Sequence, residues 1–369
     1  MTLSRILSGD LPRSRVLTAV LIVIVAGLAL APFVFPGAKA LNVAAKICIF
    51  IVLVASFDLL LGYTGIISFA HTMFFGIGAY GVAIAITRMG PTWTAVAAGV
   101  GVALLLSFAL SLVIGLFSLR VKAMFYAMIT LAVASAFQTL ASQLSDLTGG
   151  EDGLSFKVPE LLTPSFSLAE APFLGVSLNG KLISYYLLFG ATVVLFLVML
   201  RIVNSPFGRV LQAIRENEFR AEALGYRTVA YRTASNVLSA SFATLAGVLL
   251  ALWLRYNGPD TSLSFEIMID ILLIVVIGGM GTMYGAIVGG ALFIVAQNYL
   301  QDLMRLASNA ASGVPVLRDL LHPDRWLLWL GLLFIVSVYR FPVGIVGKLR
   351  LGAWARAHAD ANVKAKGVS

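Results

Sequence analysis

Long apolar runs constrain this chain more than any other feature. The stretches 16–35, 43–61 and 92–119 are apolar over most of their length, and none has an acidic residue at its centre. A helix needs about 20 such residues to cross a hydrocarbon core of roughly 30 Å, whereas a transmembrane β-barrel would show alternating strands of about 10 residues. Of the 369 residues 60% are hydrophobic and 12% are charged, against about a quarter charged in soluble domains. The sequence therefore predicts an all-α polytopic membrane protein.

The apolar runs are separated by Gly, Pro and charged residues, and these breaks mark the candidate spans. The clear spans are 17–35, 43–61, 66–87, 93–118, 123–144, 183–200, 233–254 and 326–340. The stretch 266–299 would form a helix of about 51 Å, which is too long for a single crossing. Because Gly278, Gly279 and Gly281 interrupt it, we expect two short or broken spans there, which makes ten in all.

The distribution of charge predicts the orientation. With ten spans, the segments on the side of the two termini hold 17 Lys and Arg against 8 on the other side, and Lys46 lies within a span. Since loops rich in Lys and Arg stay in the cytoplasm, both termini are expected there. The net charge of +9 then reflects topology and implies no nucleic-acid partner. The expected divisions are a cytoplasmic segment 1–16, a transmembrane domain 17–340 with a periplasmic loop 145–182 and a cytoplasmic loop 201–232, and a basic cytoplasmic tail 341–369.

Two glycine-rich stretches lie at membrane depth. Residues 62–81 read GYTGIISFAHTMFFGIGAYG, and residues 276–290 read VIGGMGTMYGAIVGG. Interrupted hydrophobic segments at matching places in two halves of a chain indicate a transport pathway, because unwound backbone is tolerated only where it is buried or lines a cavity. Close helix packing through small residues explains the same composition. Both interpretations stay open.

Few polar side chains fall within the spans. They include Asp58, His71, Gln138, Glu266 and Asp270. Because an acid at the bilayer centre costs about 2.5–3.5 kcal/mol on insertion scales, these side chains should face protein or water. Asp58 and His71 either make local structural hydrogen bonds or take part in gating. No chain of acids crosses the membrane, which argues against a proton-driven carrier.

The loop 205–226 reads SPFGRVLQAIRENEFRAEALGY and predicts one amphipathic helix along the membrane surface. Pro206 suits a helix start, 209–224 has good helix formers throughout, and Gly225 suits a C-terminal cap. An interfacial helix bound to anionic lipid is one interpretation. The three glutamates that interleave with arginines favour a protein partner instead.

The stretch RENEFRAEALGY in this loop resembles the EAA loop of ABC importer permeases. Over residues 43–300 the chain is similar to the M-type permease of branched-chain amino-acid ABC importers. The matching pieces are LLLGYTGIISFAHTMFFGIGAY at 59–80, FYAMITLA at 125–132, LTGGEDGL at 147–154, the loop itself, and ILLIVVIGGMGTMYGAIVGG at 271–290. Two positions depart from the family pattern, which commonly has Asn in place of Asp58 and Pro in place of Ala286.

The resemblance implies an ABC importer permease fold in the bacterial cytoplasmic membrane. It also implies a homologous second permease subunit, two cytoplasmic ABC ATPases and a periplasmic binding protein as partners. The loop would be the coupling helix, with Glu216, Glu218, Ala221, Glu222, Ala223 and Gly225 as docking residues. Pathway, gating or packing roles would fall on Asp58, Gly65, His71, Gly76, Gly78, Tyr126, Thr130, Gly278, Gly279 and Gly281.

The first functional hypothesis is a transport subunit for branched-chain or related small amino acids. Relatives also import urea, short amides or aromatic acids, so the resemblance leaves the substrate open. The phosphate-binding motif G-x-x-x-x-G-K-[ST] does not occur, because the lysines that follow a glycine, Lys181 and Lys348, precede leucine. We therefore expect no catalytic residue, metal or cofactor on this chain, with ATP and Mg on the partner ATPase. A stand-alone channel or secondary carrier for small neutral solutes is the alternative from a different class.

Overall fold

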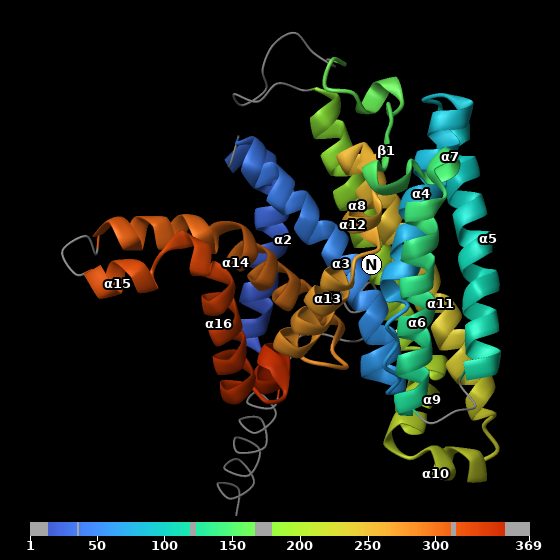
Figure 1. Cartoon of the computed structure of the whole chain (residues 1–369). Coiled ribbons are helices and arrows are strands. Elements are labelled where there is room, and N and C mark those ends of the chain that lie inside the picture. Colours follow the sequence, from blue (N-terminus) through green and yellow to red (C-terminus); the bar gives the residue numbers. More distant parts are fainter. Residues whose placement is uncertain (1–13, 35–36, 119–122, 167–178, 311–314, 351–369) are drawn as a thin grey trace, which may run out of the picture. The chain divides into compact units, whose positions relative to one another are not determined.

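The computed structural model describes residues 14–34, 37–118, 123–166, 179–310 and 315–350, and these are almost entirely helical (Figure 1). Ten helical segments among them are long and apolar enough to cross a membrane, as the sequence predicts. The long helices are α2 (Arg15–Val34), α3 (Ala38–Thr64), α4 (His71–Met89), α5 (Trp93–Ser118), α6 (Ala123–Gln143), α8 (Gly180–Val203), α11 (Thr228–Leu254), α13 (Phe265–Gly278), α14 (Met283–Ala310) and α16 (Trp326–Arg340). The short elements are α7 (Ser145–Thr148), η1 (Gly150–Asp152), β1 (Leu154–Ser155), η2 (Glu160–Leu162), α9 (Pro206–Glu216), α10 (Glu218–Ala223), β2 (Tyr256–Asn257), α12 (Pro259–Ser262), α15 (Pro315–Leu320) and η3 (Pro323–Arg325).

The helices belong to two compact units, each described here by itself. Unit 1 holds the described residues of Leu28–Leu272, and unit 2 holds those of Pro12–Gly27 and Leu273–Ser369. Unit 1 thus contains α3 to α12 and the first part of α13, while unit 2 contains the end of α13 with α14, α15 and α16. Most of the predicted segments 1–16 and 341–369 lies outside the described residues.

Helix α11 packs against α3, α4 and α5 within unit 1. Small residues let the backbones of α4 and α11 approach closely. A Cβ atom on Gly78 would overlap the carbonyl oxygen of Thr244, and one on Gly247 would overlap that of Phe75. Such close contact stabilises crossing helices through van der Waals packing. This packing is needed because the hydrophobic effect does not drive one helix onto another inside a bilayer. Helix α3 is buried over nearly all of its apolar length, so Asp58 has no access to lipid.

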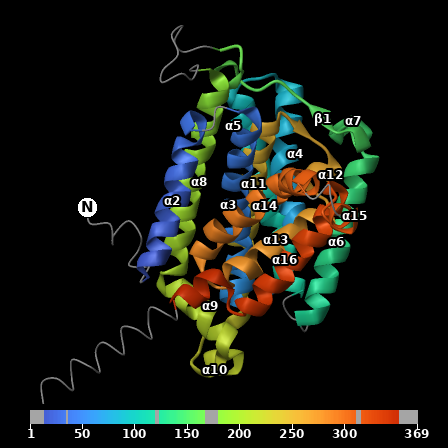
Figure 2. The same cartoon turned by 90° about the vertical axis from the view of Figure 1, so that its left-hand side faces the viewer.

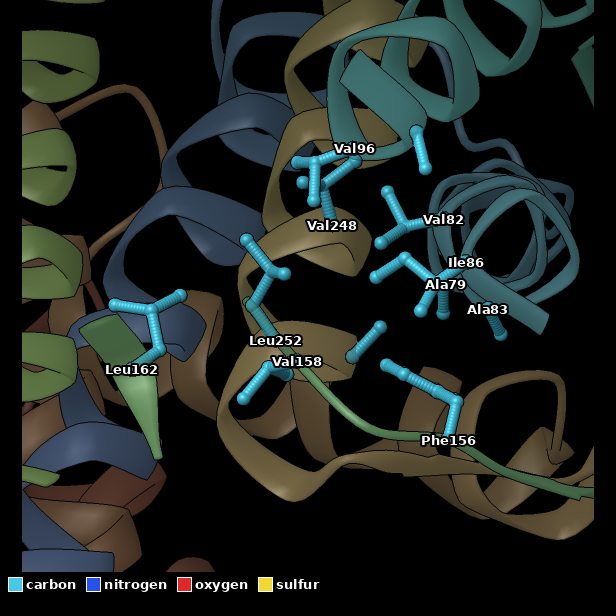
Figure 3. Packing of buried hydrophobic residues seen from close by; sticks show 12 residues of the cluster. Ala79, Val82, Ala83, Ile86, Val96, Phe156, Val158, Leu162, Val248 and Leu252 are labelled. Carbon is cyan, nitrogen blue, oxygen red and sulfur yellow. The ribbon is translucent and has the colours of Figure 1, made fainter. Parts of the chain in front are cut away.

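The two ends of unit 1 are built differently, as Figure 1 and Figure 2 both show. At one end β1 pairs antiparallel with β2, and Leu154 lies opposite Asn257. The segment after β1 packs its apolar side chains, Phe156 among them, against α4, α5 and α11 (Figure 3). Helices α9 and α10 lie at the other end. The described parts of loops 145–182 and 201–232 are therefore at opposite ends of unit 1, as the predicted topology requires.

Arg255 fastens the end that carries the strand pair. It follows α11 with φ of 58°, and its Nη2 donates a hydrogen bond to the carbonyl oxygen of Leu162 at 3.0 Å. Burial lowers the pKa of the Arg255 guanidinium, which nevertheless stays protonated at neutral pH. This bond ties the turn after α11 to η2, so the β1–β2 pair and the cluster around Phe156 are joined to one crossing helix.

Unit 2 contains the second glycine-rich stretch, and the predicted interruption is present. The chain leaves helical geometry between α13 and α14. Gly279 and Gly281 have φ of 116° and 76°, values that glycine adopts without steric penalty. A Cβ atom on Gly278 would overlap the carbonyl oxygen of Gly285, so the two helices approach closely beside the turn. The prediction that 266–299 is two segments is confirmed.

Four predicted span boundaries differ from the helix ends by a turn or more. Helix α3 begins at Ala38 where 43 is expected, and α14 ends at Ala310 where 299 is expected. The other two differences are the starts of α4 and α11. The span expected at 66–87 begins as α4 at His71, because Gly65 ends α3 in a left-handed conformation and 66–70 is non-helical. The span expected at 233–254 begins as α11 at Thr228. Hydropathy marks the apolar part of a helix and misses a polar first turn, which accounts for the earlier start of α11.

Candidate functional site

Helices α9 and α10 form an amphipathic element at one end of unit 1. Ser205 caps α9 by accepting a hydrogen bond from the Gly208 N–H at 3.5 Å, and Pro206 occupies the first turn, as the sequence predicts. Leu211 and Ile214 share one face of α9 and are buried, and α9 contacts α3, α8 and α11. The element is therefore packed on the crossing helices themselves.

The predicted single helix over 209–224 is wrong, because α9 ends at Glu216 and α10 begins at Glu218. Asn217 between them has extended backbone with φ of −159°, and its side-chain oxygen accepts a hydrogen bond from the Arg220 N–H at 2.9 Å. Asparagine is favoured at such N-cap positions, because its side chain competes with the helix for backbone hydrogen bonds. This cap starts a new helix.

Arg215 joins the α9–α10 element to the first glycine-rich stretch. Its Nη1 donates a hydrogen bond to the carbonyl oxygen of Gly62, in the last turn of α3. Its aliphatic stem lies over Gly65, where an added Cβ atom would be 3.2 Å from Arg215 Cγ. Gly65 ends α3 with φ of 75° and precedes the non-helical segment 66–70. Helix α9 therefore contacts the interruption between two crossing helices directly.

The predicted docking glutamates are partly engaged within the chain. Glu218 Oε1 pairs with Arg232 Nη1 at 2.6 Å, and Glu222 Oε1 accepts a hydrogen bond from the Thr228 hydroxyl at 2.7 Å. Both carboxylates thus fasten α10 to the start of α11. Of the other predicted docking residues, Ala221 is buried, and Glu216, Ala223 and Gly225 are exposed.

Gly225 ends α10 in the turn that its sequence position predicts. Its φ is 91°, and its N–H donates to the carbonyl oxygen of Glu222 at 2.8 Å. The Tyr226 N–H donates to the carbonyl oxygen of Ala221 at 3.1 Å. These two bonds make a Schellman motif, which requires a left-handed residue at the Gly225 position.

Two large apolar side chains that the sequence did not single out project from α10 and its C-terminal end. Phe219 is 81% exposed and Leu224 is 72% exposed. Exposed apolar side chains in a charged surrounding are typical of an interaction surface, and aromatic ones often anchor it. Their signal in the sequence is weak, because a single helix over 209–224 spreads them among many polar residues.

A second candidate site is a group of buried polar side chains inside unit 1. His71, in the first turn of α4, is 1% exposed, and its Nε2 lies 2.8 Å from Ser56 Oγ. Its ring meets the Phe57 ring edge-on at 5.2 Å. Ser56 Oγ already donates to the carbonyl oxygen of Leu53 at 2.7 Å, so the imidazole is the donor in the His71–Ser56 bond. Ser239 of α11 donates to the Ser56 carbonyl oxygen at 2.6 Å.

The same group extends to α5 and α6. Tyr126 donates a hydrogen bond to Asn236 Oδ1 at 3.3 Å, and Asn236 Nδ2 donates to the Ser111 carbonyl oxygen at 2.8 Å. Thr130 accepts a hydrogen bond from the Phe69 N–H at 3.0 Å, which ties the segment 66–70 to α6. We call this group the polar seam. Its members are Ser56, His71, Ser111, Tyr126, Thr130, Asn236 and Ser239.

The predicted pathway residues fall into both units. Unit 1 holds Asp58, Gly65, His71, Gly76, Gly78, Tyr126 and Thr130, and unit 2 holds Gly278, Gly279 and Gly281. Asp58 is 2% exposed. Gly76 adjoins the Leu263 side chain and Gly78 adjoins the α11 backbone, so both glycines allow close packing. A transport role for the predicted pathway residues stays a prediction.

The fold and these sites define the class of protein. Within the part of the chain that the structure describes, ten apolar segments are long enough to cross a membrane. Together with a polar seam buried between helices and an amphipathic element at one end, they describe a multi-pass membrane transport protein. The family described as branched-chain amino acid transport system, permease component, matches residues 39–338, and the chain belongs to this family. It is a transmembrane permease of the branched-chain amino-acid ABC transport type.

Individual relatives agree with this assignment. The chain is 28% identical over 296 residues to the high-affinity branched-chain amino acid transport system permease protein LivM of Salmonella typhimurium. This alignment covers 77% of this chain and 68% of that protein. It is 28% identical over 306 residues to the corresponding protein BraD of Pseudomonas aeruginosa, covering 79% and 89%. It is 26% identical over 250 residues to LivH of Salmonella typhimurium, covering 65% and 78%. No solved structure matches the chain.

Proposed function

We propose that the chain is the permease subunit of an ATP-driven importer for branched-chain or related small amino acids. It pairs with a homologous second permease subunit, receives substrate from a periplasmic binding protein and is driven by two cytoplasmic ABC ATPases, which hold ATP and Mg. The names of the relatives support this, since LivM, BraD and LivH are each described as permease proteins of high-affinity branched-chain amino acid transport. The likeness to both LivM and LivH supports pairing between related permeases.

The proposed membrane is the bacterial cytoplasmic membrane. The α9–α10 element and both termini face the cytoplasm, and the end with the β1–β2 pair faces the periplasm. The excess of Lys and Arg on the α9–α10 side supports this orientation. The low charge content of the spans supports a neutral or zwitterionic solute.

One observation carries the proposal, namely the contact of α9 with the interruption between α3 and α4. Arg215 holds the last turn of α3 through Gly62, and Thr130 of α6 holds the following segment through Phe69. These two bonds would carry a movement of α9 to α3 and to the segment 66–70, which α6 holds. Small shifts of packed helices are a common means of switching between two states.

Phe219 and Leu224 form the surface that α10 offers to the ATPase. Because Glu218 and Glu222 are engaged with α11, the exposed apolar pair carries the proposed contact. In protein interfaces a few such anchors supply most of the binding free energy. ATPase closure then pushes on α10, and α9 passes the movement to the crossing helices.

ATP hydrolysis by the complete transporter in proteoliposomes tests this proposal. Phe219→Ala and Leu224→Ala are each expected to weaken ATPase binding about tenfold or more, since truncating an interface anchor costs about 2 kcal/mol. Leu105→Ala is the matched control, because Leu105 is an exposed leucine in the middle of α5, away from both ends of unit 1. Substrate-stimulated hydrolysis that is unchanged in both α10 variants would contradict the proposed coupling.

The substrate class has its own test. Uptake of labelled leucine is measured in competition with isoleucine, valine, urea, a short amide and an aromatic acid. Branched-chain amino acids are expected to compete at the lowest concentrations. Competition by urea, the amide or the aromatic acid alone would assign the substrate to that class and would not contradict the ATP-driven mechanism.

A further inference from the structure

A groove on unit 1 shares no lining residue with either candidate site. It has a volume of about 550 Å³ and runs between α4, α5 and α6. Its lining is almost wholly apolar, and representative residues are Ile84 and Ala85 of α4, Ala98 and Val102 of α5, and Phe137 and Leu140 of α6. All three helices are crossing segments, so the groove lies at membrane depth.

The groove follows from unequal packing of the three helices. Helix α5 lies close along α4, where a Cβ atom on Gly99 would be 2.6 Å from the Gly81 carbonyl oxygen. Helix α6 makes far fewer contacts with either α4 or α5. The faces of α5 and α6 that flank α4 therefore stay apart, and side chains such as Val102 and Leu140 remain exposed along the opening.

One cation lies among the lining residues. Arg88 is in the last turn of α4, is exposed, and donates a long hydrogen bond of 3.5 Å to the carbonyl oxygen of Asp146. An arginine near the end of a crossing helix extends its guanidinium toward the headgroup region while its stem stays among apolar groups. The groove thus combines an apolar trough with a positive charge at its membrane-surface end.

The volume favours hydrocarbon chains over a protein helix. A crossing helix about 10 Å wide and about 30 Å long occupies on the order of 2,000 Å³, so a partner helix could insert only one ridge of side chains here. The groove falls instead within the range of about 300–1,000 Å³ that is usual for small-molecule sites. In a bilayer the available molecules of this shape are lipids.

We propose that this groove binds an acyl chain of an anionic phospholipid and that Arg88 binds its phosphate. The apolar walls select the hydrocarbon chain, and the charge of Arg88 selects an anionic headgroup over a zwitterionic one. The bound lipid fills the space between α5 and α6 and links both helices to α4. This assignment does not depend on the substrate or on the ATPase.

Photolabelling of the full chain in nanodiscs tests the site. The probe is phosphatidylglycerol with a diazirine near the end of one acyl chain, and labelled peptides are identified by mass spectrometry. Label is expected on peptides of α4, α5 and α6. Ala98→Phe places a ring in the groove and should lower this labelling about tenfold, because the acyl chain loses several buried methylenes.

A matched control stands next to this position on α5. Ala97 is exposed and does not line the groove, so Ala97→Phe should leave labelling of the three helices unchanged. If Ala98→Phe lowers the yield of folded protein, Val102→Trp fills the same groove from an exposed position. Loss of label in either filling variant, with retention in Ala97→Phe, supports the site.

The headgroup contact is tested separately. Arg88→Gln should lower labelling by the phosphatidylglycerol probe about fivefold and leave a phosphatidylcholine probe little changed. Arg201→Gln is the control, since Arg201 is also an exposed arginine in the last turn of a crossing helix. The proposal is overturned if label is spread evenly over exposed helices, if both filling variants label normally, or if cross-linking places a second protein chain in the groove.

Discussion

At the scale of single residues, the polar seam shows how unit 1 keeps polar groups at membrane depth. His71 donates to Ser56, Ser56 donates to the carbonyl oxygen of Leu53, and Ser239 donates to the carbonyl oxygen of Ser56. Three helices, α3, α4 and α11, therefore meet at Ser56. Since no water is available in a bilayer core, each such group needs a protein partner, and the partners specify how the helices fit together.

Ser56→Ala separates the two roles predicted for His71. The variant removes the acceptor of the imidazole, and it should lower the free energy of unfolding by about 0.6–1.7 kcal/mol, the range found for hydrogen bonds between crossing helices. Thermal unfolding in nanodiscs measures this change. If His71 serves local structure, uptake per folded molecule should stay unchanged.

Ser241→Ala provides the control for this measurement. The Ser241 hydroxyl donates only within α11, to the carbonyl oxygen of Val237 at 2.8 Å, so its loss should affect stability little. A gating role for His71 would appear as altered uptake in Ser56→Ala without altered stability. That outcome would contradict the structural account.

The sequence identifies some of the site's side chains but not the partners that they contact, and the reason is physical. The charge pattern indicates Glu218 and Glu222 as candidates for contact with a protein partner. In the structure they contact Arg232 and Thr228, which lie on another helix. The bond of Arg215 to Gly62 joins residues 153 positions apart. Composition and spacing report what lies along one element, whereas such pairs arise only once two elements have packed.

At the scale of elements, the α9–α10 pair differs from the single helix that the sequence suggests. The start at Pro206 and the turn at Gly225 follow from local preferences and are confirmed. The break at Asn217 also depends on a local cap, but the helix formers on both sides of it made the sequence favour one continuous helix. The break near Gly279 was predictable, because the length of the apolar stretch and its glycine content both indicated an interruption there. Local signals thus predict an element best when they do not compete.

Arg215→Gln tests whether α9 transmits movement to α3. Glutamine keeps part of the stem but loses the charged donor to Gly62, so ATPase binding should persist while substrate-stimulated hydrolysis and uptake fall. A hydrogen bond from a charged group contributes about 1.5–3 kcal/mol, which corresponds to a fall of at least tenfold. Hydrolysis and uptake are measured on the same proteoliposomes.

The control for this variant is a neighbouring arginine. Arg209 is an exposed arginine of α9, and Arg209→Gln should leave both rates near those of the native protein. Equal effects of the two variants would show that general charge on α9 matters and that the Arg215–Gly62 bond does not. Unchanged coupling in Arg215→Gln would have the same consequence.

At the scale of the whole molecule, we expect ten crossings with both termini on one side. The sequence predicts this from hydropathy and charge, and ten helical segments of suitable length are present among the described residues. The described parts of the loops predicted on opposite faces lie at opposite ends of unit 1. What hydropathy could not supply is which crossing helices touch, because nearly every span has apolar residues on all sides and so lacks a distinct inward face.

Labelling of introduced cysteines tests the proposed orientation. The native Cys48 is fully buried, so a membrane-impermeant maleimide should not reach it. Ser165→Cys, at the β1 end, should react in intact cells. Ala223→Cys, in α10, should react only after permeabilisation, and the reverse pattern would invert the orientation.

Uptake of radiolabelled leucine by proteoliposomes tests the central claim most directly. The liposomes contain this chain, the second permease and the ATPases, with enclosed ATP and external binding protein. We predict accumulation above the external concentration that ceases when ATP, the ATPases or the binding protein is omitted. Equal leucine flux through liposomes that contain this chain alone would contradict the account and identify a stand-alone channel or carrier.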